Sequence, residues 1–387
     1  MDQPFLTVPP EMIKDATATD AYFERTDETL AYADKNPRVV AEVTADQFSD
    51  GSYEVIAGLN EVADLFEGMP VDVDALPEGT LFDGGPVLTI EGPYRSFLRH
   101  ETPLLGLLSP ASAYATRALA ARTVAESTPL FSFGSRHLHP VMAAVVERSA
   151  LIGGFDGISN VAAGELIGRE ATGTMPHSLL LVFGPDHMVE AWTAFDEAVD
   201  DDVARIALCD TFTDERDESL EAARALGDAL DGVRLDTTGS RRGDFRHIVK
   251  EVRWELDANG FEHVDIILSG GIDLDLIEML HPHADGFGVG SYITDAPPVD
   301  FALDIVEVEG QSTSKRGKLS GRKAVYRTRD GEHVIRRASQ SSPTDAESLL
   351  QPLVRDGEIV ATFDIDQSAT RAREDAETVE FDPWHHG

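Results

Sequence analysis

Residues 153–178 concentrate side chains that can bind a ligand or react with it. The sequence there is GGFDGISNVAAGELIGREATGTMPHS, which sets glycines, Ser159, Asn160, Thr174 and His177 around two short apolar runs. Glycines let backbone N–H groups approach a ligand, and the hydroxyl, amide and imidazole groups can then contact it. In the alternative interpretation the glycines only mark turns, and His177 is a partly buried histidine with satisfied hydrogen bonds.

Two more glycine-rich loops predict a phosphate site. One follows the predicted strand 264–268 and opens a helix at 273–280, and the other ends the predicted strand 286–289. Free backbone N–H groups and helix N-termini attract phosphate; the alternative role is tight packing of glycine against neighbouring strands. The candidate phosphate-binding residues are Ser269, Gly270, Gly271, Gly288, Gly290 and Ser291.

A cation and an anion, Arg234 and Asp236, stand two residues apart on one predicted strand. Their side chains therefore point to the same face of the strand and enter the same opening of the predicted barrel. The alternative is a salt-bridged pair with a structural role only.

Residues 116–298, which contain these candidate site residues, show a repeating pattern of predicted strands and helices. Apolar strand candidates alternate with amphipathic helices, which predicts an α/β fold with an irregular, TIM-like parallel barrel of seven strands. A turn rich in polar residues follows each strand candidate, and barrel enzymes place their sites at these strand ends. The predicted strands are 130–133, 151–154, 171–173, 205–208, 233–235, 264–268 and 286–289.

Residues 1–115 predict an N-terminal α/β sandwich domain. Its expected elements are a helix near 20–33 and short strands separated by turn residues, at 52–56, 79–82 and 87–90, with one turn at 49–51. A helical stretch at 97–127 joins this domain to the barrel.

Residues 299–387 predict a small C-terminal region of short strands, a basic loop and an acidic tail. The last part, 364–387, is expected to be a frayed helix or disordered. The barrel domain, 116–298, thus carries the active site between two flanking regions.

The chain is strongly acidic, with 70 Asp and Glu residues against 32 Lys and Arg and a formal net charge of −38. A nucleic-acid partner is therefore not expected. Only 6 of the 32 basic residues are lysine. Because high salt screens the repulsion of such a surface, we predict a halophilic source; the alternative is an acidic enzyme of a mesophile.

The single cysteine, Cys209, excludes an intrachain disulfide and a zinc site of paired cysteines. The N-terminus lacks a basic start followed by an apolar core, and no run approaches the roughly 18 apolar residues of a membrane span. We therefore expect a soluble, cytoplasmic protein with no membrane partner and no zinc.

The segments 156–161, DGISNV, and 173–177, GTMPH, resemble the GTSNV and GTMxH segments of the nicotinate phosphoribosyltransferases, in the archaeal branch. The resemblance covers residues from about 19 to 325. It implies an enzyme of NAD biosynthesis that forms nicotinate mononucleotide and pyrophosphate from nicotinate and phosphoribosyl pyrophosphate, coupled to hydrolysis of ATP as co-substrate, with Mg²⁺.

The resemblance also implies roles for residues of the barrel. His177 becomes the residue that ATP phosphorylates, although the family often has A-H-E where this chain has Pro176-His177-Ser178. Arg234 approaches the pyridine base, and Asp236 contacts the ribose and the magnesium-linked pyrophosphate. Thr174 and Asp210 are further candidates for substrate contacts. The candidates for the pyrophosphate are Arg136, His137, Arg241 and Arg242, and the alternative for Arg241 and Arg242 is a solvated surface charge.

Residues before and after the barrel complete the implied site. Tyr22, in a T-D-x-Y segment, is expected to reach the site of a neighbouring subunit and to stack on the base opposite Phe133. This requires a homo-oligomer, a dimer or higher. Ser159 favours the acid over the amide, because relatives that use nicotinamide carry aspartate there. Lys318 lies in a basic loop, 315–323, that approaches the active site in the family or is otherwise a solvated hairpin.

Two other functions stay open. Quinolinate phosphoribosyltransferase shares the architecture, but it must hold two carboxylates and release carbon dioxide. A non-catalytic phosphate-binding barrel is the alternative from a different class.

Overall fold

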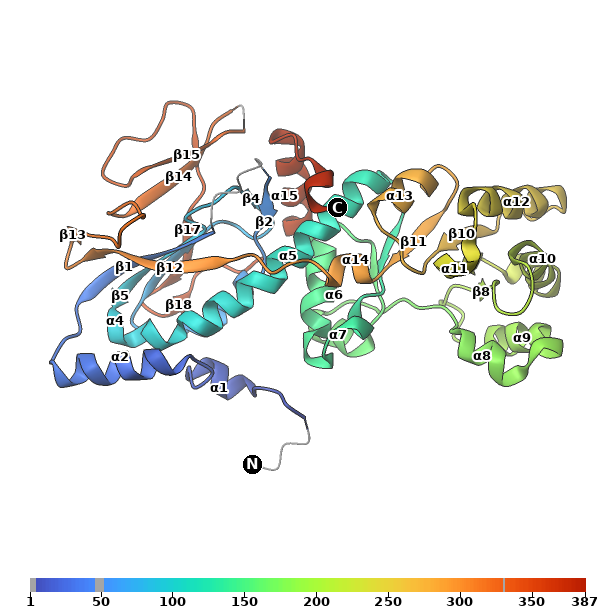
Figure 1. Ribbon diagram of the computed structural model, residues 1–387, viewed down its shortest axis with the longest axis horizontal. Helices are drawn as coiled ribbons and strands as arrows, with labels where there is room; N and C mark the ends of the chain where they lie inside the picture. Colours follow the sequence, from blue (N-terminus) through green and yellow to red (C-terminus); the bar gives the residue numbers. More distant parts are fainter. Residues whose placement is uncertain (1–4, 46–51, 330) are drawn as a thin grey trace. The chain divides into compact units, whose positions relative to one another are not determined.

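The computed structural model describes residues 5–45, 52–329 and 331–387, so the predicted turn 49–51 lies outside the described residues. The chain forms two compact units. The first unit contains residues 1–119, 152–154 and 296–385, and the second contains 120–151, 155–295 and 386–387. Figure 1 labels their elements along the chain.

The first unit is built on a sheet of seven antiparallel strands. In sheet order they are β13 (Gln311–Ser312), β12 (Phe301–Val308), β1 (Arg38–Ala45), β5 (Leu88–Pro93), β3 (Asp72–Ala75), β17 (Gln351–Arg355) and β18 (Glu358–Ile359). The N-terminal strands β1, β5 and β3 form the centre of this sheet, and C-terminal strands flank them on both sides, because β12 pairs with β1 and β17 pairs with β3. The predicted C-terminal region, 299–387, is thus almost wholly part of the first unit.

Two smaller sheets and a set of helices complete the first unit. The smaller sheets are β15-β14-β16, formed by His333–Arg337, Lys323–Arg327 and Glu347–Ser348, and β2-β4, formed by Glu54–Val55 and Leu81–Phe82. The helices are α1 (Pro10–Lys14), α2 (Ala21–Tyr32), α3 (Leu59–Phe66), α4 (Tyr94–Phe97), α5 (Glu101–Ala125) and α15 (Ile365–Thr378). The predicted helices near 20–33 and 97–127 correspond to α2 and α5, whereas the predicted sandwich arrangement is not confirmed.

Helix α5 carries the chain from the first unit into the second. Small side chains such as Ala115 and Ala118 are buried along it. A Cβ on Gly153 would lie 2.5 Å from the carbonyl oxygen of Ala115. The absence of a side chain at Gly153 therefore permits this close approach.

The second unit is built on six parallel strands. In sheet order they are β7 (Gly157–Ile158), β6 (Leu130–Ser132), β11 (Gly286–Val289), β10 (Asp265–Leu268), β9 (Gly232–Leu235) and β8 (Ile206–Leu208). Strand β11 and all but the first residue of β10 are buried, as expected for the centre of a parallel sheet.

Five of the seven predicted strands match β6, β8, β9, β10 and β11. The predicted strand 151–154 is wrong, because residues 151 and 152 end helix α6 (Ala143–Ile152) and the strand follows at β7. Of the predicted strand 171–173, only Ala171 forms a bridge, to Ile158. The described strands make an α/β fold whose sheet has β7 and β8 at its edges, so a closed seven-stranded barrel is not confirmed.

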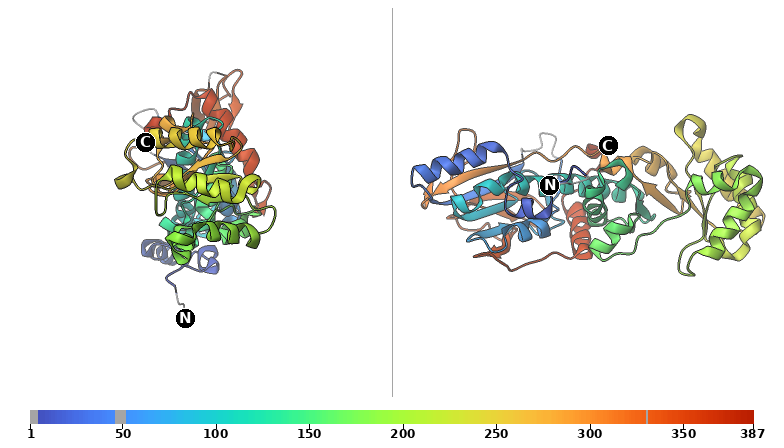
Figure 2. Two further views of the ribbon diagram at one scale, coloured as in Figure 1. Left: turned by 90° about the vertical axis from the view of Figure 1, so that its right-hand side faces the viewer. Right: turned by 90° about the horizontal axis from the view of Figure 1, so that it is seen from below.

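Helices connect the parallel strands, as the alternating pattern predicts. They are α7 (Val161–Ile167), α8 (His177–Phe183), α9 (Met188–Ala198), α10 (Glu215–Leu226), α11 (Gly239–Arg242), α12 (Phe245–Ala258), α13 (Leu274–Leu280) and α14 (Ser291–Thr294). In space α8 packs on α9, α9 on α10 and α10 on α12, and both further views show this layer (Figure 2). Over residues 5–45, 52–329 and 331–387, no helix combines the length and the apolar character that a bilayer span requires.

Candidate active site

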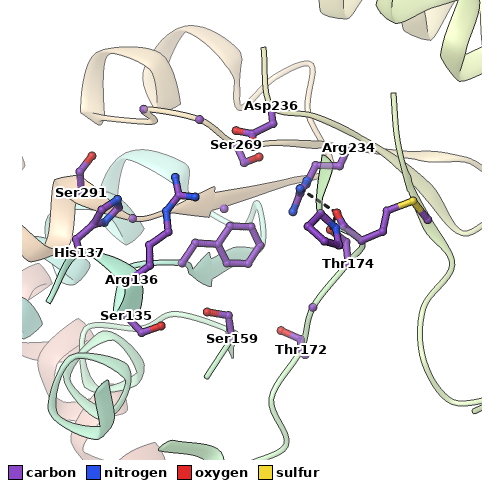
Figure 3. Close-up of a pocket in the computed structure, with 18 residues that line it drawn as sticks. Ser135, Arg136, His137, Ser159, Thr172, Thr174, Arg234, Asp236, Ser269 and Ser291 are labelled. Atoms are coloured by element: carbon purple, nitrogen blue, oxygen red, sulfur yellow. Dashed lines mark hydrogen bonds between the residues drawn. The ribbon is translucent and has the colours of Figure 1, made fainter. Parts of the chain in front are cut away.

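A pocket of about 590 Å³ opens at the carboxyl ends of the parallel strands (Figure 3). All of its lining residues belong to the second unit. They follow β6, β7 and β10, lie in or just after β9 and β11, or lie in the segment before α8. The lining residues are Phe133, Ser135, Arg136, His137, Ser159, Thr172, Gly173, Thr174, Met175, Pro176, Arg234, Asp236, Ser269, Gly270, Gly271, Gly288, Gly290 and Ser291.

The two predicted phosphate loops lie together in this pocket. Gly270 and Gly271 have φ values of +85° and +68°, a conformation that side chains rarely adopt. A Cβ on Gly270 would stand 2.4 Å from Oδ1 of Asp236, so the loop packs directly against that carboxylate. Ser269 adds a buried hydroxyl that lacks a hydrogen-bond partner among the described residues. These loops can present backbone N–H groups to a phosphate.

An aromatic wall forms beside the glycine loops. The ring of Phe133 occupies the space beside Gly288, where a Cβ would lie 2.2 Å from Cε2 of the ring. The guanidinium carbon of Arg234 lies 6.0 Å from the centre of the same ring. The pocket therefore offers one apolar ring face and one cation side by side, which suits a flat aromatic ligand that carries a negative charge.

Arg234 is held in place by the segment before α8. Its Nη2 donates to the carbonyl oxygen of Met175 at 3.1 Å. Burial lowers the pKa of Arg234, and its Nε is buried without a hydrogen-bond partner in the described part of the chain. A buried guanidinium with unused donor capacity favours an anionic partner.

His177 begins α8 and joins two carboxylates. Its Nε2 lies 3.0 Å from Oδ1 of Asp210, and its Nδ1 lies 4.0 Å from Oδ2 of Asp236. Asp210 is buried, and its other oxygen accepts the backbone N–H of Asp236 at 2.7 Å. Burial raises the pKa of the Asp210 carboxyl, and the charge of His177 acts against this rise. Asp210 thus fixes the ring of His177 beside the pocket residue Asp236.

The carboxylate of Asp236 is the acidic group that reaches the pocket. The described residues contain no group of three or more His, Cys, Asp or Glu side chains that could hold a metal ion by themselves. Mg²⁺ commonly binds through one or two carboxylates together with substrate phosphates. Asp236 beside two phosphate loops fits that mode of binding.

Two family models match most of the chain. They are the quinolinate phosphoribosyl transferase N-terminal domain, over residues 20–112, and C-terminal domain, over residues 114–304. A nicotinate phosphoribosyltransferase of Mycobacterium tuberculosis is 33% identical over 336 residues, which cover 80% of this chain and 67% of that protein. This chain belongs to the quinolinate and nicotinate phosphoribosyltransferases.

Solved structures agree with this family. A nicotinate-nucleotide pyrophosphorylase from Pyrococcus furiosus is 45% identical, with a TM-score of 0.93 over 98% of this chain and 100% of that one. Human nicotinic acid phosphoribosyltransferase, at 22% identity, shares the fold with a TM-score of 0.79 over 95% of both chains. A nicotinate phosphoribosyltransferase of Bacillus subtilis is 28% identical and matches over 75% of this chain and 60% of its own length.

For this phosphoribosyltransferase, most of the predicted site residues lie in the pocket. Asn160 instead caps α7, because its Oδ1 accepts the N–H of Ala163 at 3.0 Å. Its Nδ2 lies 3.5 Å from the hydroxyl of Ser135, which does line the pocket. Asn160 therefore does not line the pocket itself but contacts Ser135, which does.

Two predicted residues lie in the first unit. Tyr22 is exposed on α2, and its ring centre lies 4.3 Å from that of Phe23. Lys318 lines a separate pocket of that unit, where its Nζ lies 3.4 Å from the hydroxyl of Thr44 and 3.7 Å from Oδ2 of Asp304. The predicted role of Tyr22 concerns a neighbouring subunit and that of Lys318 concerns a loop near the active site, and both stay predictions.

Arg242 binds and packs against neighbouring residues and does not line the pocket. It donates to the carbonyl oxygens of Thr237, at 3.0 Å, and of Gly270, and its guanidinium carbon lies 4.4 Å from the ring centre of Phe245. Arg242 therefore does not line the pocket and Arg241 is exposed, and their candidate contacts with pyrophosphate stay predictions.

Sequence reasoning missed two buried glutamates that support the site. Glu147 accepts the hydroxyl hydrogen of Ser159 at 3.3 Å. Glu218 accepts the backbone N–H groups of Thr211 and Phe212, at 2.8 and 2.6 Å, and so holds the loop that follows Asp210. Both stand at apolar-face positions of their helices, and an acidic residue at such a position is the pattern that could have indicated them.

Proposed function

We propose that this chain is a nicotinate phosphoribosyltransferase, an enzyme that forms nicotinate mononucleotide and pyrophosphate from nicotinate and phosphoribosyl pyrophosphate. The curated relatives from M. tuberculosis and B. subtilis carry this name. The observation that carries the proposal is one pocket lined by an aromatic ring, a buried guanidinium and two glycine-rich loops. The activity places the protein in NAD biosynthesis.

The pocket can hold the base and the sugar phosphate at the same time. The ring of Phe133 packs on one face of the pyridine, and Arg234 binds its carboxylate with a charge-assisted hydrogen bond. Backbone N–H groups of the loops 269–271 and 290–291 bind the 5-phosphate of the ribose. Arg136 and His137 line the pocket beside Gly290 and are the basic groups available to the pyrophosphate.

The transfer itself needs positioning and charge neutralisation more than covalent help. The bond from the ribose to pyrophosphate lengthens, positive charge develops on the sugar, and the pyridine nitrogen forms the new bond. The carboxylate of Asp236 stabilises that positive charge. Mg²⁺, which Asp236 would hold together with the substrate, supplies neutralisation of the pyrophosphate charge.

His177 is proposed to couple the transfer to ATP. Because Nε2 of His177 is bound to Asp210, Nδ1 is the nitrogen left to act as nucleophile. Nδ1 attacks the γ-phosphorus of ATP, ADP leaves, and hydrolysis of the phosphohistidine later releases phosphate. The carboxylate of Asp210 holds the ring in the required orientation.

Quinolinate phosphoribosyltransferase is the second candidate. It is favoured by the family models and by the positive charge of Arg136, which helps to lower the pKa of Arg234 and so lies near it. Two guanidinium groups could hold two carboxylates. Supplying nicotinate and quinolinate separately, and measuring nucleotide and carbon dioxide, decides between these substrates.

The test of the proposed function is release of pyrophosphate from nicotinate, phosphoribosyl pyrophosphate and Mg²⁺, with and without ATP. Release with nicotinate supports the proposal and excludes a non-catalytic phosphate-binding barrel. The variant His177→Ala should lose the stimulation by ATP and keep some ATP-independent transfer. Full stimulation in this variant would contradict the role of His177.

Finer features of the proposed enzyme follow from the sequence. We infer a cytoplasmic enzyme of the archaeal branch from a halophile, on the basis of the acidic, lysine-poor composition and the single cysteine. We also infer a homo-oligomer in which Tyr22 completes the site of a neighbouring subunit. Its exposed position on α2 leaves the ring accessible for such a contact.

A further inference from the structure

A buried carboxyl group stands behind the pocket. Glu147 lies in α6 with none of its surface exposed, in a stretch of apolar neighbours that includes Val146 and Ala150. Ser159, which lines the pocket, donates its hydroxyl hydrogen to Oε1 of Glu147 at 3.3 Å. Glu147 therefore acts on the pocket through Ser159.

The single hydroxyl hydrogen of Ser159 determines whether this residue offers a substrate a hydrogen-bond donor or an acceptor. When Glu147 is ionised it can only accept, so the single hydroxyl hydrogen of Ser159 is used on Glu147 and Ser159 offers the pocket an acceptor. When Glu147 is protonated it can donate to Ser159, and the hydroxyl hydrogen of Ser159 is then free to point into the pocket. The two forms present opposite hydrogen-bonding polarity from the same atom.

The surroundings of Glu147 favour the protonated form more than water does. Burial raises the pKa of Glu147, and the nearby donor groups of Ser132, Ser159 and Asn160 act against this rise. These groups come from β6 and from the loop after β7, and none of them carries a charge.

The two possible bases differ in the same property. The carboxylate of nicotinate has acceptors only, so it needs a donor from the protein. The amide of nicotinamide carries an NH₂ group, which an acceptor can bind. A buried polar group that is left unpaired costs about 1–3 kcal/mol, so a mismatch at Ser159 would discriminate between the bases.

We propose that Glu147 is the positioning residue for base selection: with its proton it turns the Ser159 hydroxyl into a donor for nicotinate, and without it Ser159 becomes an acceptor. The inference rests on the proposed function and goes beyond it, because it assigns base selection to a residue that does not touch the substrate. Ser159 and Glu147 together then discriminate between the charged carboxylate of nicotinate and the neutral amide of nicotinamide.

The test compares the wild-type enzyme with Glu147→Gln between pH 6 and pH 9, without ATP. The amide of glutamine donates to Ser159 at every pH and so imitates protonated Glu147. In the wild type, loss of the Glu147 proton as the pH is raised should increase the KM for nicotinate about tenfold or more with a smaller change in kcat, and nicotinamide should become a better competitor. In Glu147→Gln the KM should stay within about twofold over this range.

Two more variants complete the experiment. Ser159→Ala should have a high KM without this pH dependence, and it tests the pair if Glu147→Gln does not fold. Glu190→Gln, which changes an exposed glutamate on α9, should keep the wild-type profile. His177 and Asp210 are unchanged in both the wild type and Glu147→Gln, so any effect of these two residues is common to both enzymes.

The outcomes separate the two proposals. If the wild type releases no pyrophosphate with nicotinate, the proposed function fails. If it is active and the KM of Glu147→Gln rises with pH as in the wild type, the role of Glu147 is overturned. An unchanged pH profile in Ser159→Ala overturns it as well.

Discussion

At the scale of single residues, Arg234 and Asp236 line one pocket, and Glu147 contacts it through the hydroxyl of Ser159. The types and spacing of Arg234 and Asp236 predicted that both enter one pocket, and both line it. Asn160 was predicted beside them, but a side chain that follows a strand and precedes a helix also satisfies the helix N-terminus, which it does here. Glu147 was missed because its partner Ser159 is twelve residues away and meets it only in the folded chain.

Arg234 is expected to contribute most to binding of the base. Replacing Arg234 with glutamine removes the charge opposite the carboxylate of nicotinate. A hydrogen bond to a charged group contributes about 1.5–3 kcal/mol, so the KM for nicotinate should rise roughly ten- to a hundredfold. Steady-state kinetics at saturating phosphoribosyl pyrophosphate measure this change.

The exposed neighbour Arg241 provides the matched control. Arg241→Gln removes the same charge from the same segment of chain and should leave the KM for nicotinate close to that of the wild type. Equal effects of the two substitutions would show that general charge, and not contact with the base, explains the result.

Glu101 gives the first unit a pH-dependent stability. Burial, followed by the charge of Asp304, raises the pKa of Glu101 from 4.5 to about 7. Between these pH values the native state holds a proton that the unfolded chain releases, so the free energy of unfolding should fall as the pH rises through this window. Urea unfolding at pH 5 and pH 8, at constant salt, measures the difference.

Glu101→Gln should reduce this pH dependence, since glutamine does not titrate. The variant Glu28→Gln, at an exposed position of α2, serves as its control and should keep the wild-type dependence. A wild-type profile in Glu101→Gln would mean that other groups cause the loss of stability.

At the scale of elements, the alternation of strands and helices predicted the central strands of the second unit's parallel sheet well. It predicted the edge strand β7 poorly. The central strands β10 and β11 are apolar runs bounded by turn residues, and both were predicted. Residues 151 and 152 were predicted as a strand because the periodicity of a short apolar run does not distinguish a strand from a helix. The true edge strand β7 contains only two residues, too few to produce a pattern.

The contact between β11 and the loop after β6 should be sensitive to a single methyl group. Gly288→Ala places a Cβ 2.2 Å from the ring of Phe133, so the ring must move out of the position where it can pack on the base. We expect the KM for nicotinate to rise and the melting temperature to fall, because overpacking costs about 1–3 kcal/mol. Kinetics and calorimetry on one preparation measure both effects.

Gly106→Ala is the control for this substitution. A Cβ at Gly106, within α5, would meet no atom within 4 Å. This variant should keep its KM and should be stabilised, if anything, by about 0.5–1 kcal/mol through the helix preference of alanine. A larger loss of stability in Gly106→Ala than in Gly288→Ala would refute the packing argument.

At the scale of the whole molecule, the sequence predicted the family but not how the chain divides. A change of pattern near residue 298 predicted a separate C-terminal region, but residues 296–385 belong to the first unit. Pairing between β1 and β12 joins residues about 260 positions apart, such as Val43 and Leu303. Local periodicity carries no information on a pairing of this range.

The net charge of −38 should make stability depend on salt. We expect the melting temperature to rise as potassium chloride is increased from tenths molar to molar, because added ions screen the repulsion among carboxylates. Sucrose, which does not screen charge, provides a comparison for non-electrostatic stabilisation. A melting temperature that falls with potassium chloride would contradict a halophilic adaptation.

The shared sheet of the first unit has a consequence for the order in which the protein matures on the ribosome. Strands β1, β5 and β3 are synthesised first, but their neighbours β12 and β17 follow only after the whole second unit has been made. The second unit can therefore complete its parallel sheet during translation, whereas β1 and β3 wait with open edges. The part of the chain that is made first is the part that finishes folding last.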